Sequence, residues 1–309
     1  ADGTTHTVNI VINGTNDVPE VTGPVIGAVT EDGTTTASGQ LKATDVDTND
    51  KLTWEVSGSA TGSYGTIAID QTGKWTYTLD DDKAAALTSK DHPVETFTVT
   101  VSDGHGGTVT KTIDITVNGA DNGAIITPHV PGDDQGTVIE DDKLTTGGKL
   151  DIVDPDAGEA VFQPQAGTNG SYGTFTVDAN GNWGYTLANT NPAVQALGVD
   201  EKLTEAFTVT SADGTTHTVN IVINGTNDVP TLGTGVGAVT EDVNVSDGKL
   251  STSGTVSITD TDAGESSFKA GAAFTSSTAT GGAQLGALVF DTNGSYSYSV
   301  DNSKVQYLK

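Results

Sequence analysis

The stretch ETFTVTVSDGHGG, residues 95–107, alternates apolar and polar side chains and then enters a glycine-rich turn. Phe97, Val99 and Val101 share one face, while the threonines between them share the other. A period of two with a single apolar face is typical of a half-buried antiparallel strand. The glycines that follow Asp103 supply the chemistry of a hairpin turn. This stretch therefore predicts one strand of an antiparallel β-sheet.

The same pattern recurs along the chain. KWTYTLD at 74–80 again places its large side chains on one face, after a turn signal, DQTG, at 70–73. Short helical turns are predicted at 82–87 and 192–197. Seven strands are predicted within about 100 residues, at roughly 20–30, 35–44, 51–57, 64–69, 74–79, 95–102 and 108–117. Seven short strands indicate a two-sheet sandwich of immunoglobulin or cadherin type. Its core is expected to centre on Trp54, Trp75, Tyr77 and Phe97.

The chain also repeats itself. Residues 1–19 and 212–230 are identical, and SYGTIAIDQTGKWTYTL at 63–79 matches SYGTFTVDANGNWGYTL at 171–187. The period is about one domain length, which is too long for a solenoid and fits units that each bury a core of their own. The predicted fold is all-β, with tandem immunoglobulin/cadherin-like β-sandwich modules of about 105 residues joined end to end.

This repeat sets the expected module boundaries. Residues 1–17 match the last strand and linker of a preceding module, and 18–121 and 122–228 are two complete modules. Residues 229–309 are a third module, which is incomplete. The sequence is therefore expected to be a window cut from a longer array, with further copies of the same module as neighbours.

Composition restricts the possible partners. The chain has 41 acidic and 13 basic residues and a net charge of -28. This charge excludes nucleic-acid binding through phosphate contacts and argues against attraction to anionic membranes. No apolar run approaches the roughly 18 residues of a membrane helix, so no membrane insertion is expected. The absence of cysteine excludes disulfides and thiolate metal sites.

The acidic residues recur at fixed places in each repeat, next to the predicted linkers. Because strands run up and down a sandwich, their turns collect at its two ends. One end of the first module is expected to gather Asn16, Asp17, Asp45, Asp47 and Asp103. The next junction is expected to gather Glu31, Asp32, Asp121, Asp154, Asp156 and Asp213. The last is expected to gather Glu140, Asp141, Asn227, Asp228, Asp260 and Asp262.

Converging carboxylates predict a divalent cation. Bare unit charges about 4 Å apart repel by a few kcal/mol per pair at an effective dielectric near 20. Calcium accepts six to eight oxygen ligands in irregular geometry, whereas magnesium prefers a strict octahedron and zinc prefers histidine or cysteine. A single Asp is as well explained as an ordinary turn residue. The D-x-D pair that recurs beside every linker favours Ca²⁺.

The string VTEDG…ASGQLKATDVD…GSYGTIAID…GKWTYTLD…ETFTVTVSDGHGG…VNGADN resembles the VCBS-type, cadherin-like repeats of giant bacterial RTX adhesins. The resemblance spans the first two modules and the third as far as it runs. It implies export by type I secretion and a role as a stalk in surface attachment and biofilm. The layout of Glu31, Asn16, Asp17, Asp45, Asp47 and Asp103 is similar to the calcium layout between cadherin domains. The third module departs from the pattern with an insert at 271–284.

Three functions follow as hypotheses. The first is a structural extender, a stalk stiffened by calcium at module junctions on the bacterial cell surface. The second is an adhesive module that itself binds a glycan or protein, for which the insert at 271–284 is the candidate site. An enzyme is not expected, because no nucleophile motif accompanies the acids. The spare strand sequence at 1–15 adds a third hypothesis, a strand-exchanged extracellular filament of several chains.

Overall fold

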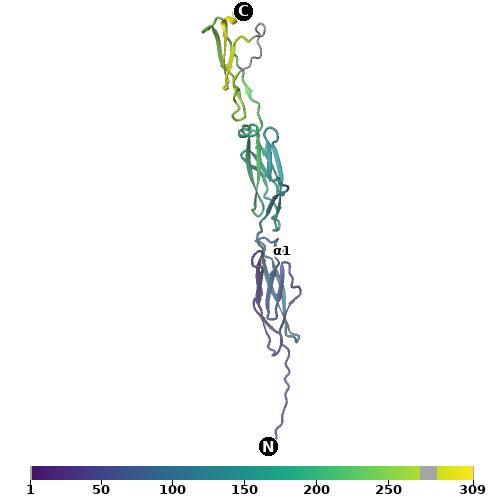
Figure 1. Cartoon of the computed structure of the whole chain (residues 1–309). Coiled ribbons are helices and arrows are strands. Elements are labelled where there is room, and N and C mark those ends of the chain that lie inside the picture. Colours follow the sequence, from purple (N-terminus) through teal and green to yellow (C-terminus); the bar gives the residue numbers. More distant parts are fainter. Residues whose placement is uncertain (1, 272–283, 309) are drawn as a thin grey trace. The chain divides into compact units, whose positions relative to one another are not determined.

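The computed structural model describes residues 2–271 and 284–308 (Figure 1). These residues are nearly all β, in tandem cadherin-like β-sandwich domains. Most of the expected insert at 271–284 lies outside the described residues. The chain divides into two compact units. Unit 1 comprises Ala1–Thr127, Ile152–Phe162 and Thr210–Thr215, and unit 2 comprises Pro128–Asp151, Gln163–Val209 and Thr216–Lys309.

Unit 1 holds a sandwich of short strands. One sheet has the order β2 (Ile26–Thr30), β9 (Thr108–Asn118), β8 (Val94–Ser102) and β5 (Thr53–Ser57). A second has the order β3 (Thr36–Gln40), β7 (Lys74–Leu79) and β6 (Gly65–Ile69), and β1 (Glu20–Thr22) pairs with β4 (Lys42–Thr44). The short helix α1 (Asp81–Ala84) follows β7. Strand β2 runs parallel to β9, whereas the other pairings are antiparallel.

The core of this sandwich is the predicted one. Trp75 and Tyr77 are fully buried, and Trp54 and Phe97 are 6% and 4% exposed. Along β8, Phe97, Val99 and Val101 are buried, while the threonines between them are partly or fully exposed. The period-two alternation of residues 95–102 therefore placed the apolar face of this strand correctly, because one face of the sheet is covered and the other is solvated.

Two strands predicted as continuous are broken. The stretch 20–30 forms β1 and β2, and the stretch 35–44 forms β3 and β4. Between β1 and β2, Gly23 has φ +127°, and a Cβ there would collide with the backbone of Gln40. Pro24 follows and has no N–H for a sheet ladder, while its carbonyl oxygen accepts a 3.0 Å hydrogen bond from Trp75 Nε1. The break lets the first half of the strand pair with β4 and the second half with β9.

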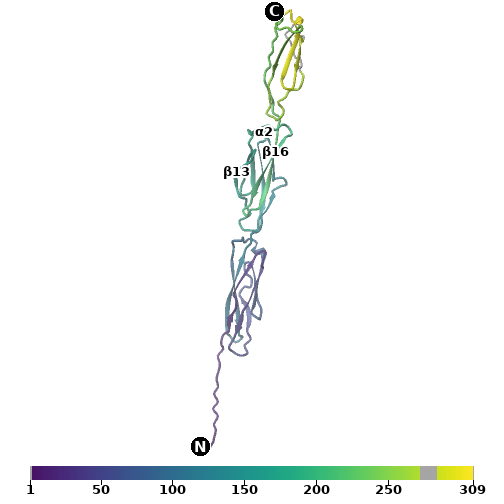
Figure 2. The same cartoon turned by 90° about the vertical axis from the view of Figure 1, so that its left-hand side faces the viewer.

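Unit 2 repeats much of this plan. One sheet has the order β11 (Gln135–Ile139), β17 (Thr216–Asn224) and β16 (Lys202–Thr210), with β11 parallel to β17. Another has the order β10 (Ile125–Pro128), β12 (Thr145–Val153), β15 (Asn182–Leu187), β14 (Gly173–Val177) and β13 (Gln165–Asn169). The helix α2 (Pro192–Gln195) begins at a proline, after Asn191 whose side chain accepts from the Ala193 N–H. Figure 2 labels β13, β16 and α2.

The counterpart of β5 is shorter in the second sandwich. Strand β5 pairs with β8, and Trp54 lies opposite Val101. In the second sandwich this pairing is reduced to a single bridge between Phe162 and Ser211. Pro164 follows Phe162, where the first sandwich has Val56, and a proline cannot donate to the ladder. Residues 165–169 then form β13, which pairs with β14 as Thr61 bridges Thr66 in the first sandwich.

The C-terminal part of unit 2, residues 226–308, is called here the C-terminal segment. Its main sheet has the order β19 (Lys249–Thr255), β22 (Ser295–Asp301) and β21 (Ala287–Phe290). Strands β18 (Thr231–Leu232) and β20 (Ile258–Thr259) form a second pair, and the 3-10 turn η2 (Asn302–Lys304) follows β22. A small buried cluster contains Leu250, Val300 and Val305.

Candidate metal centres

Three clusters of acidic residues lie where linkers meet loops of the sandwiches. Cluster 1 contains Asn16, Asp17, Asp45, Asp47, Asp50 and Asp103. Cluster 2 contains Glu31, Asn122, Asp154, Asp156, Glu159 and Asp213. Cluster 3 contains Glu140, Asn227, Asp228, Asp260 and Asp262. Clusters 1 and 2 belong to unit 1, and cluster 3 belongs to unit 2.

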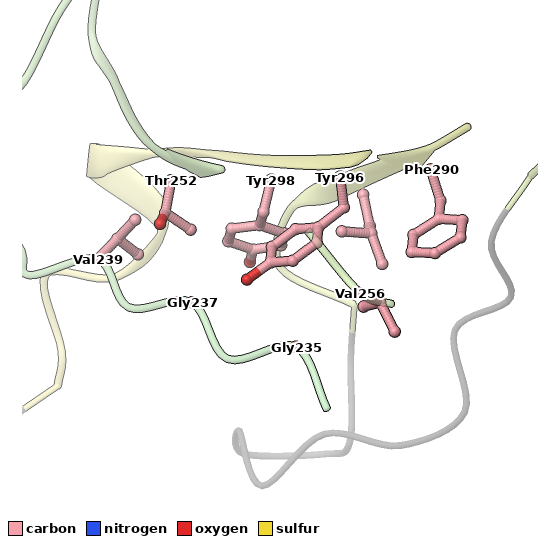
Figure 3. A pocket seen from close by; sticks show the side chains of 9 residues that line it. Gly235, Gly237, Val239, Thr252, Val256, Phe290, Tyr296 and Tyr298 are labelled. Carbon is pink, nitrogen blue, oxygen red and sulfur yellow. The ribbon is translucent and has the colours of Figure 1, made fainter. Parts of the chain in front are cut away.

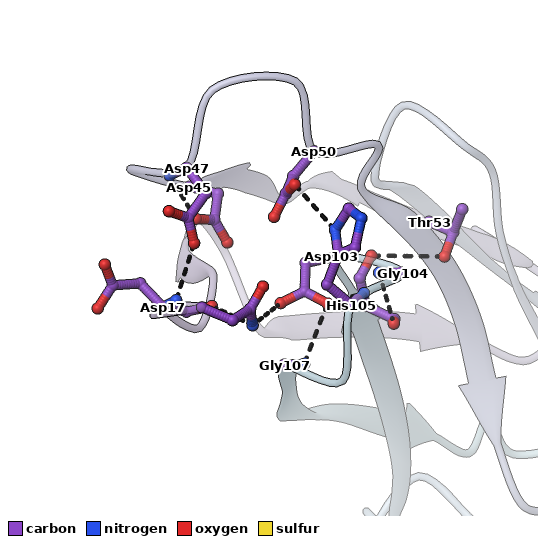
Figure 4. Close-up of polar contacts among 11 residues, drawn as sticks. Asp17, Asp45, Asp47, Asp50, Thr53, Asp103, Gly104, His105 and Gly107 are labelled. Carbon is purple, nitrogen blue, oxygen red and sulfur yellow. Dashed lines mark hydrogen bonds and ion pairs between the residues drawn. The ribbon is translucent and has the colours of Figure 1, made fainter. Parts of the chain in front are cut away.

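Cluster 1 brings three carboxylates of one loop together. Carboxylate oxygens of Asp45, Asp47 and Asp50 lie within 4.8 Å of one another (Figure 4). The Asp47 N–H donates to Asp45 Oδ1 over 2.9 Å, which curls the loop as in an Asx turn. The Asp17 N–H donates to Asp47 Oδ2 over 2.8 Å and so ties the linker to the loop. One oxygen each of Asp45 and Asp50 is buried without a hydrogen-bond partner.

Asp103 closes cluster 1 from the β8–β9 turn. The side chain is 1% exposed and accepts from Asn16 Nδ2 at 2.8 Å and from the His105 N–H at 2.7 Å. The Asn16 bond is the main reason that the pKa of Asp103 lies below its ordinary value. His105 Nδ1 lies 2.9 Å from Asp50 Oδ1, so this imidazole contacts the cluster. Asp103 is therefore tied both to the linker and to the β8–β9 turn.

Cluster 2 repeats the loop geometry. The Asp156 N–H donates to Asp154 Oδ1 over 2.9 Å, and the Asn122 N–H donates to Asp156 Oδ2 over 2.7 Å. Asn122 Nδ2 reaches Glu31 Oε1 over 3.2 Å, and the Ala124 N–H reaches Asp213 Oδ2 over 2.9 Å. Asp154 Oδ2 and Asp156 Oδ1 are buried without a partner. The linker residue Asn122 thus bonds Glu31 through its side chain and Asp156 through its backbone N–H.

The negative charges of cluster 2 repel one another. Burial, followed by the charges of Asp32 and Asp156, holds the pKa of Glu31 above its ordinary value. Burial and the charges of Asp121, Asp156 and Asp154 do the same for the pKa of Glu159. Burial alone would also raise the pKa of Asp213, but its hydrogen bonds outweigh this and hold that pKa well below the usual range. Cluster 2 therefore combines two carboxyl groups with a raised pKa, Glu31 and Glu159, with one whose pKa is lowered, Asp213.

Cluster 3 has the same pattern in unit 2. The Asp262 N–H donates to Asp260 Oδ1 over 3.1 Å, and the Asp228 N–H donates to Asp262 Oδ2 over 2.9 Å. Glu140 is 1% exposed and accepts from the Thr226 N–H at 2.9 Å. Its other oxygen and Asp262 Oδ1 are buried without a partner. Burial and the neighbouring acids, Asp228 first among them, raise the pKa of Glu140.

Some predicted residues are turned toward other partners. Asp32 is exposed and takes a left-handed backbone, with φ +53°. Both oxygens of Asp121 accept hydrogen bonds from Ser89, which lower the pKa of Asp121. Asp141 accepts from the side chains of Asn189 and Gln195, which lower its pKa. These three acids lie beside their clusters, where their charges still raise the pKa values of Glu31, Glu159 and Glu140.

Sequence reasoning missed a third acid in each loop. Asp50 joins cluster 1, and Glu159 interacts with cluster 2. Glu265 stands at the same place beyond Asp262, within the turn closed by the Glu265 N–H and the Asp262 carbonyl. The signal was available, because the repeats align as D-x-D-x-x-D/E. The polar, glycine-rich stretch around His105 predicts a solvated imidazole, and the side chain is 62% exposed while its Nδ1 contacts Asp50.

Comparison with known families identifies the repeats. The bacterial cadherin-like domain family matches residues 16–119 and again residues 127–225. The chain belongs to this family. Cadherin-like repeats are extracellular domains of the adhesion type. No helix within the described residues 2–271 and 284–308 has the length and apolar character needed to span a membrane. A search of curated proteins finds no match.

Solved cadherin structures are similar to this chain. A protocadherin gammaB7 EC3-6 cis-dimer structure is 15% identical, with 91% of this chain and 65% of that chain covered and a TM-score of 0.46. Mouse cadherin-23 EC22-24 is 16% identical, with 93% and 89% covered and a TM-score of 0.44. Human desmocollin-1 ectodomain is 13% identical, with 91% and 52% covered and a TM-score of 0.29. The bacterial cadherin-like chain thus spans about two thirds of the protocadherin structure and about half of the desmocollin structure.

Proposed function

We propose that this bacterial cadherin-like chain is an extender region of a large surface adhesin, in which calcium stiffens the junctions between repeats. Such a region would hold a binding domain away from the cell and support attachment and biofilm. The resemblance to RTX adhesins with VCBS-type repeats is part of this proposal. The observation that carries the proposal is the set of buried carboxylate oxygens without hydrogen-bond partners in all three clusters.

The donor chemistry fits calcium. Every cluster offers carboxylate oxygens and a linker asparagine, which are hard ligands, and the irregular spacing of a loop and a linker suits a cation that tolerates varied geometry. Zinc would require imidazole or thiolate ligands, and the one imidazole beside cluster 1 is engaged with Asp50. A cation bound among these oxygens would offset the burial and the repulsion that together raise the pKa values of Glu31 and Glu140.

Binding would also connect the linker to the loops. In each cluster a linker N–H already bonds the second Asp of the D-x-D pair, at Asp17, Asn122 and Asp228. A cation held by the same loop would fix that linker further. We expect affinity in the range of about 10⁻⁴ to 10⁻³ M that is typical of extracellular calcium modules. Such sites would stay empty in the cytosol before export and fill outside the cell.

The proposal is tested by a double substitution in cluster 2, Asp154→Asn with Asp156→Asn. Calorimetric titration should show the loss of the calcium sites of this cluster, and the calcium-induced rise in Tm should shrink. The matched control is Glu55→Gln with Asp114→Asn, which removes two negative charges on strand positions outside the clusters. If the control loses as much calcium binding as the cluster variant, the acids act only as a diffuse negative surface and the proposal fails.

A further inference from the structure

The linkers of the three clusters differ in the order of two residues. The linkers of clusters 1 and 3 read Asn-Asp, at 16–17 and 227–228, whereas the linker of cluster 2 reads Asp-Asn, at 121–122. The backbone of the second residue is placed alike in all three, because its N–H bonds the second Asp of the D-x-D pair. The exchange therefore puts an amide in cluster 2 where clusters 1 and 3 have a carboxylate.

The amide of Asn122 completes the hydrogen bonding of a buried glutamate. Glu31 is 3% exposed, and its Oε2 accepts from the Ala120 N–H over 3.2 Å. Its Oε1 accepts from Asn122 Nδ2 over 3.2 Å. Both oxygens of this carboxylate thus have a donor in the linker. Protein groups alone therefore join Glu31 to the linker of cluster 2.

The corresponding glutamate of cluster 3 lacks the second donor. Glu140 is 1% exposed and accepts from the Thr226 N–H over 2.9 Å, but its Oε2 is buried without a hydrogen-bond partner. Asp228 stands at the place of Asn122, and an ionised carboxylate cannot donate. The negative charge of Asp228 also acts on Glu140. A carboxylate in place of the amide thus removes one hydrogen bond and adds one repulsion.

The loop after the short helix adds to this difference. Asp121 accepts from the N–H and the hydroxyl of Ser89 over 2.7 and 2.8 Å, and the positive charge of Lys90 acts on Asp121. The counterparts of Ser89 and Lys90 at cluster 3 are Val199 and Asp200. Val199 has no polar side-chain group, and Asp200 carries a negative charge in place of a positive one. The linker of cluster 2 therefore has ties that cluster 3 replaces with an apolar and an acidic residue.

One backbone contact is common to both clusters and sets the difference apart. The Ala157 N–H donates to the Ala86 carbonyl over 3.2 Å, and the Ala263 N–H donates to the Ala196 carbonyl over 3.0 Å. Each bond joins a D-x-D loop to the loop after a short helix, and no side chain takes part. The two clusters thus share their backbone framework, and they differ in the side chains of the linker and of the loop beside it.

We propose that the order of the two linker residues sets how strongly each cluster depends on calcium. With Asp-Asn, cluster 2 keeps its linker joined to Glu31 without a cation. With Asn-Asp, cluster 3 leaves Glu140 unsatisfied until a cation enters, and offers that cation one more carboxylate at the linker. Removal of calcium therefore frees residues 225–229 more than residues 119–124. The role of the cation rests on the proposed function, whereas the difference in hydrogen bonding does not.

Hydrogen exchange of the whole chain in chelator tests the difference. Asn122→Asp removes the donor to Glu31 and adds a charge, so exchange of residues 119–124 should become about tenfold faster or more. Asp228→Asn is the reverse change and should slow the exchange of residues 225–229. Asn180→Asp, at an exposed turn outside the clusters, is the control for added charge. Unchanged exchange of residues 119–124 in Asn122→Asp, or an equal effect of the control, overturns the proposal.

A second substitution should rescue the first. Glu31→Gln in the Asn122→Asp chain restores a pair of one amide and one carboxylate with the donor on the other side. Exchange of residues 119–124 in chelator should then return toward the wild-type rate. A further acceleration in the double variant would show that general loss of packing, and not the pairing of these two side chains, controls the exchange, and it would overturn the proposal.

The sheet of the C-terminal segment is the internal reference for Asp228→Asn. Tyr296 and Tyr298 of β22 line a cavity of about 380 Å³ beside this sheet (Figure 3). The residues that line the cavity include none of cluster 3. Exchange of residues 295–301 should therefore be the same in the wild type and in the variant. A change there as large as that at residues 225–229 would assign the effect to the whole fold and overturn the proposal.

Calcium titration of the same variants separates this proposal from the proposed function. Calcium should restore the protection that Asn122→Asp loses in chelator, because the new carboxylate is a further ligand. Equal protection of residues 119–124 by calcium in the wild type and in Asn122→Asp would overturn the proposal while the calcium function stands. Protection that is lost in chelator and that calcium does not restore would support the difference in hydrogen bonding and refute the calcium function.

Discussion

At the scale of single residues, one buried pair of polar side chains joins the two sheets of a sandwich. Tyr77 of β7 donates to Glu95 of β8 over 2.5 Å, and Tyr185 of β15 donates to Glu205 of β16 over 2.6 Å. Glu95 also accepts from the Tyr64 N–H over 3.0 Å. Burial, followed by the hydrogen bond to Glu95, raises the pKa of Tyr77. The pair therefore connects β7, β8 and the loop before β6.

Removal of the phenol should cost stability. Tyr77→Phe leaves a buried carboxylate oxygen unsatisfied and should lower the free energy of unfolding of its sandwich by about 2 kcal/mol. Because the folded pKa of Tyr77 is raised, its contribution is full below the unfolded value of 10.0 and declines as pH rises above it. Urea unfolding at neutral and alkaline pH measures both effects. Tyr64→Phe is the control, since its backbone donor to Glu95 remains; equal loss in both variants would contradict the account.

Protonation of the buried acids in the clusters should stabilise the calcium-free fold, whereas their ionised form should favour the stability gained from calcium. The raised pKa of Glu140 means that the calcium-free fold gains stability as pH falls from 7 toward the ordinary glutamate value of 4.5. Glu140→Gln keeps an acceptor for the Thr226 N–H and removes the charge. It should raise Tm in chelator at pH 7, flatten the pH dependence and weaken the gain from calcium. A lower Tm of the variant in chelator would contradict this prediction, because it would show that the charge of Glu140 does not destabilise the calcium-free fold.

At the scale of elements, the packing of the first strand of a sandwich on its last depends on one glycine. A Cβ on Gly27 of β2 would lie 2.8 Å from Ile115 Cδ1 and 2.9 Å from the Trp75 ring. Gly27→Ala should therefore destabilise this sandwich by about 1–3 kcal/mol through overpacking. Gly33→Ala is the control, because the nearest atoms there lie 3.6 Å away. Chemical denaturation of the two variants compares them, and equal stabilities would refute the packing role.

Most elements could be predicted from alternation and turn residues, because the sandwich covers one face of each strand. The parallel pairing of β2 with β9 could not, since side-chain pattern does not report which strand lies beside another. The shortening of the β5 counterpart to one bridge, Phe162 with Ser211, follows from Pro164, a signal visible in the sequence but not interpreted. The clusters were predicted in outline because linkers and loops meet at sandwich ends. Asp50 was missed although its place in the D-x-D-x-x-D/E spacing was visible, whereas the contact of His105 with Asp50 forms only in the folded loop.

At the scale of the whole molecule, the proposed stiffness resides in the junctions between repeats. Within each described cluster, a few hydrogen bonds join the linker to the loop. Several carboxylates in the same place repel one another and oppose this contact. The sandwiches bury their own aromatic or aliphatic cores and do not need the clusters for those cores. Removal of calcium should therefore loosen the junctions while the β-sheets persist.

Small-angle X-ray scattering of the whole chain, with calcium and with chelator, tests this claim most directly. Circular dichroism of the same samples monitors the sheets, and the Asp154→Asn, Asp156→Asn variant isolates the contribution of cluster 2. The account predicts a sharply defined, longer maximum dimension in calcium, and a broader distribution of dimensions in chelator with unchanged β-sheet signal. Identical scattering profiles in calcium and in chelator would contradict it.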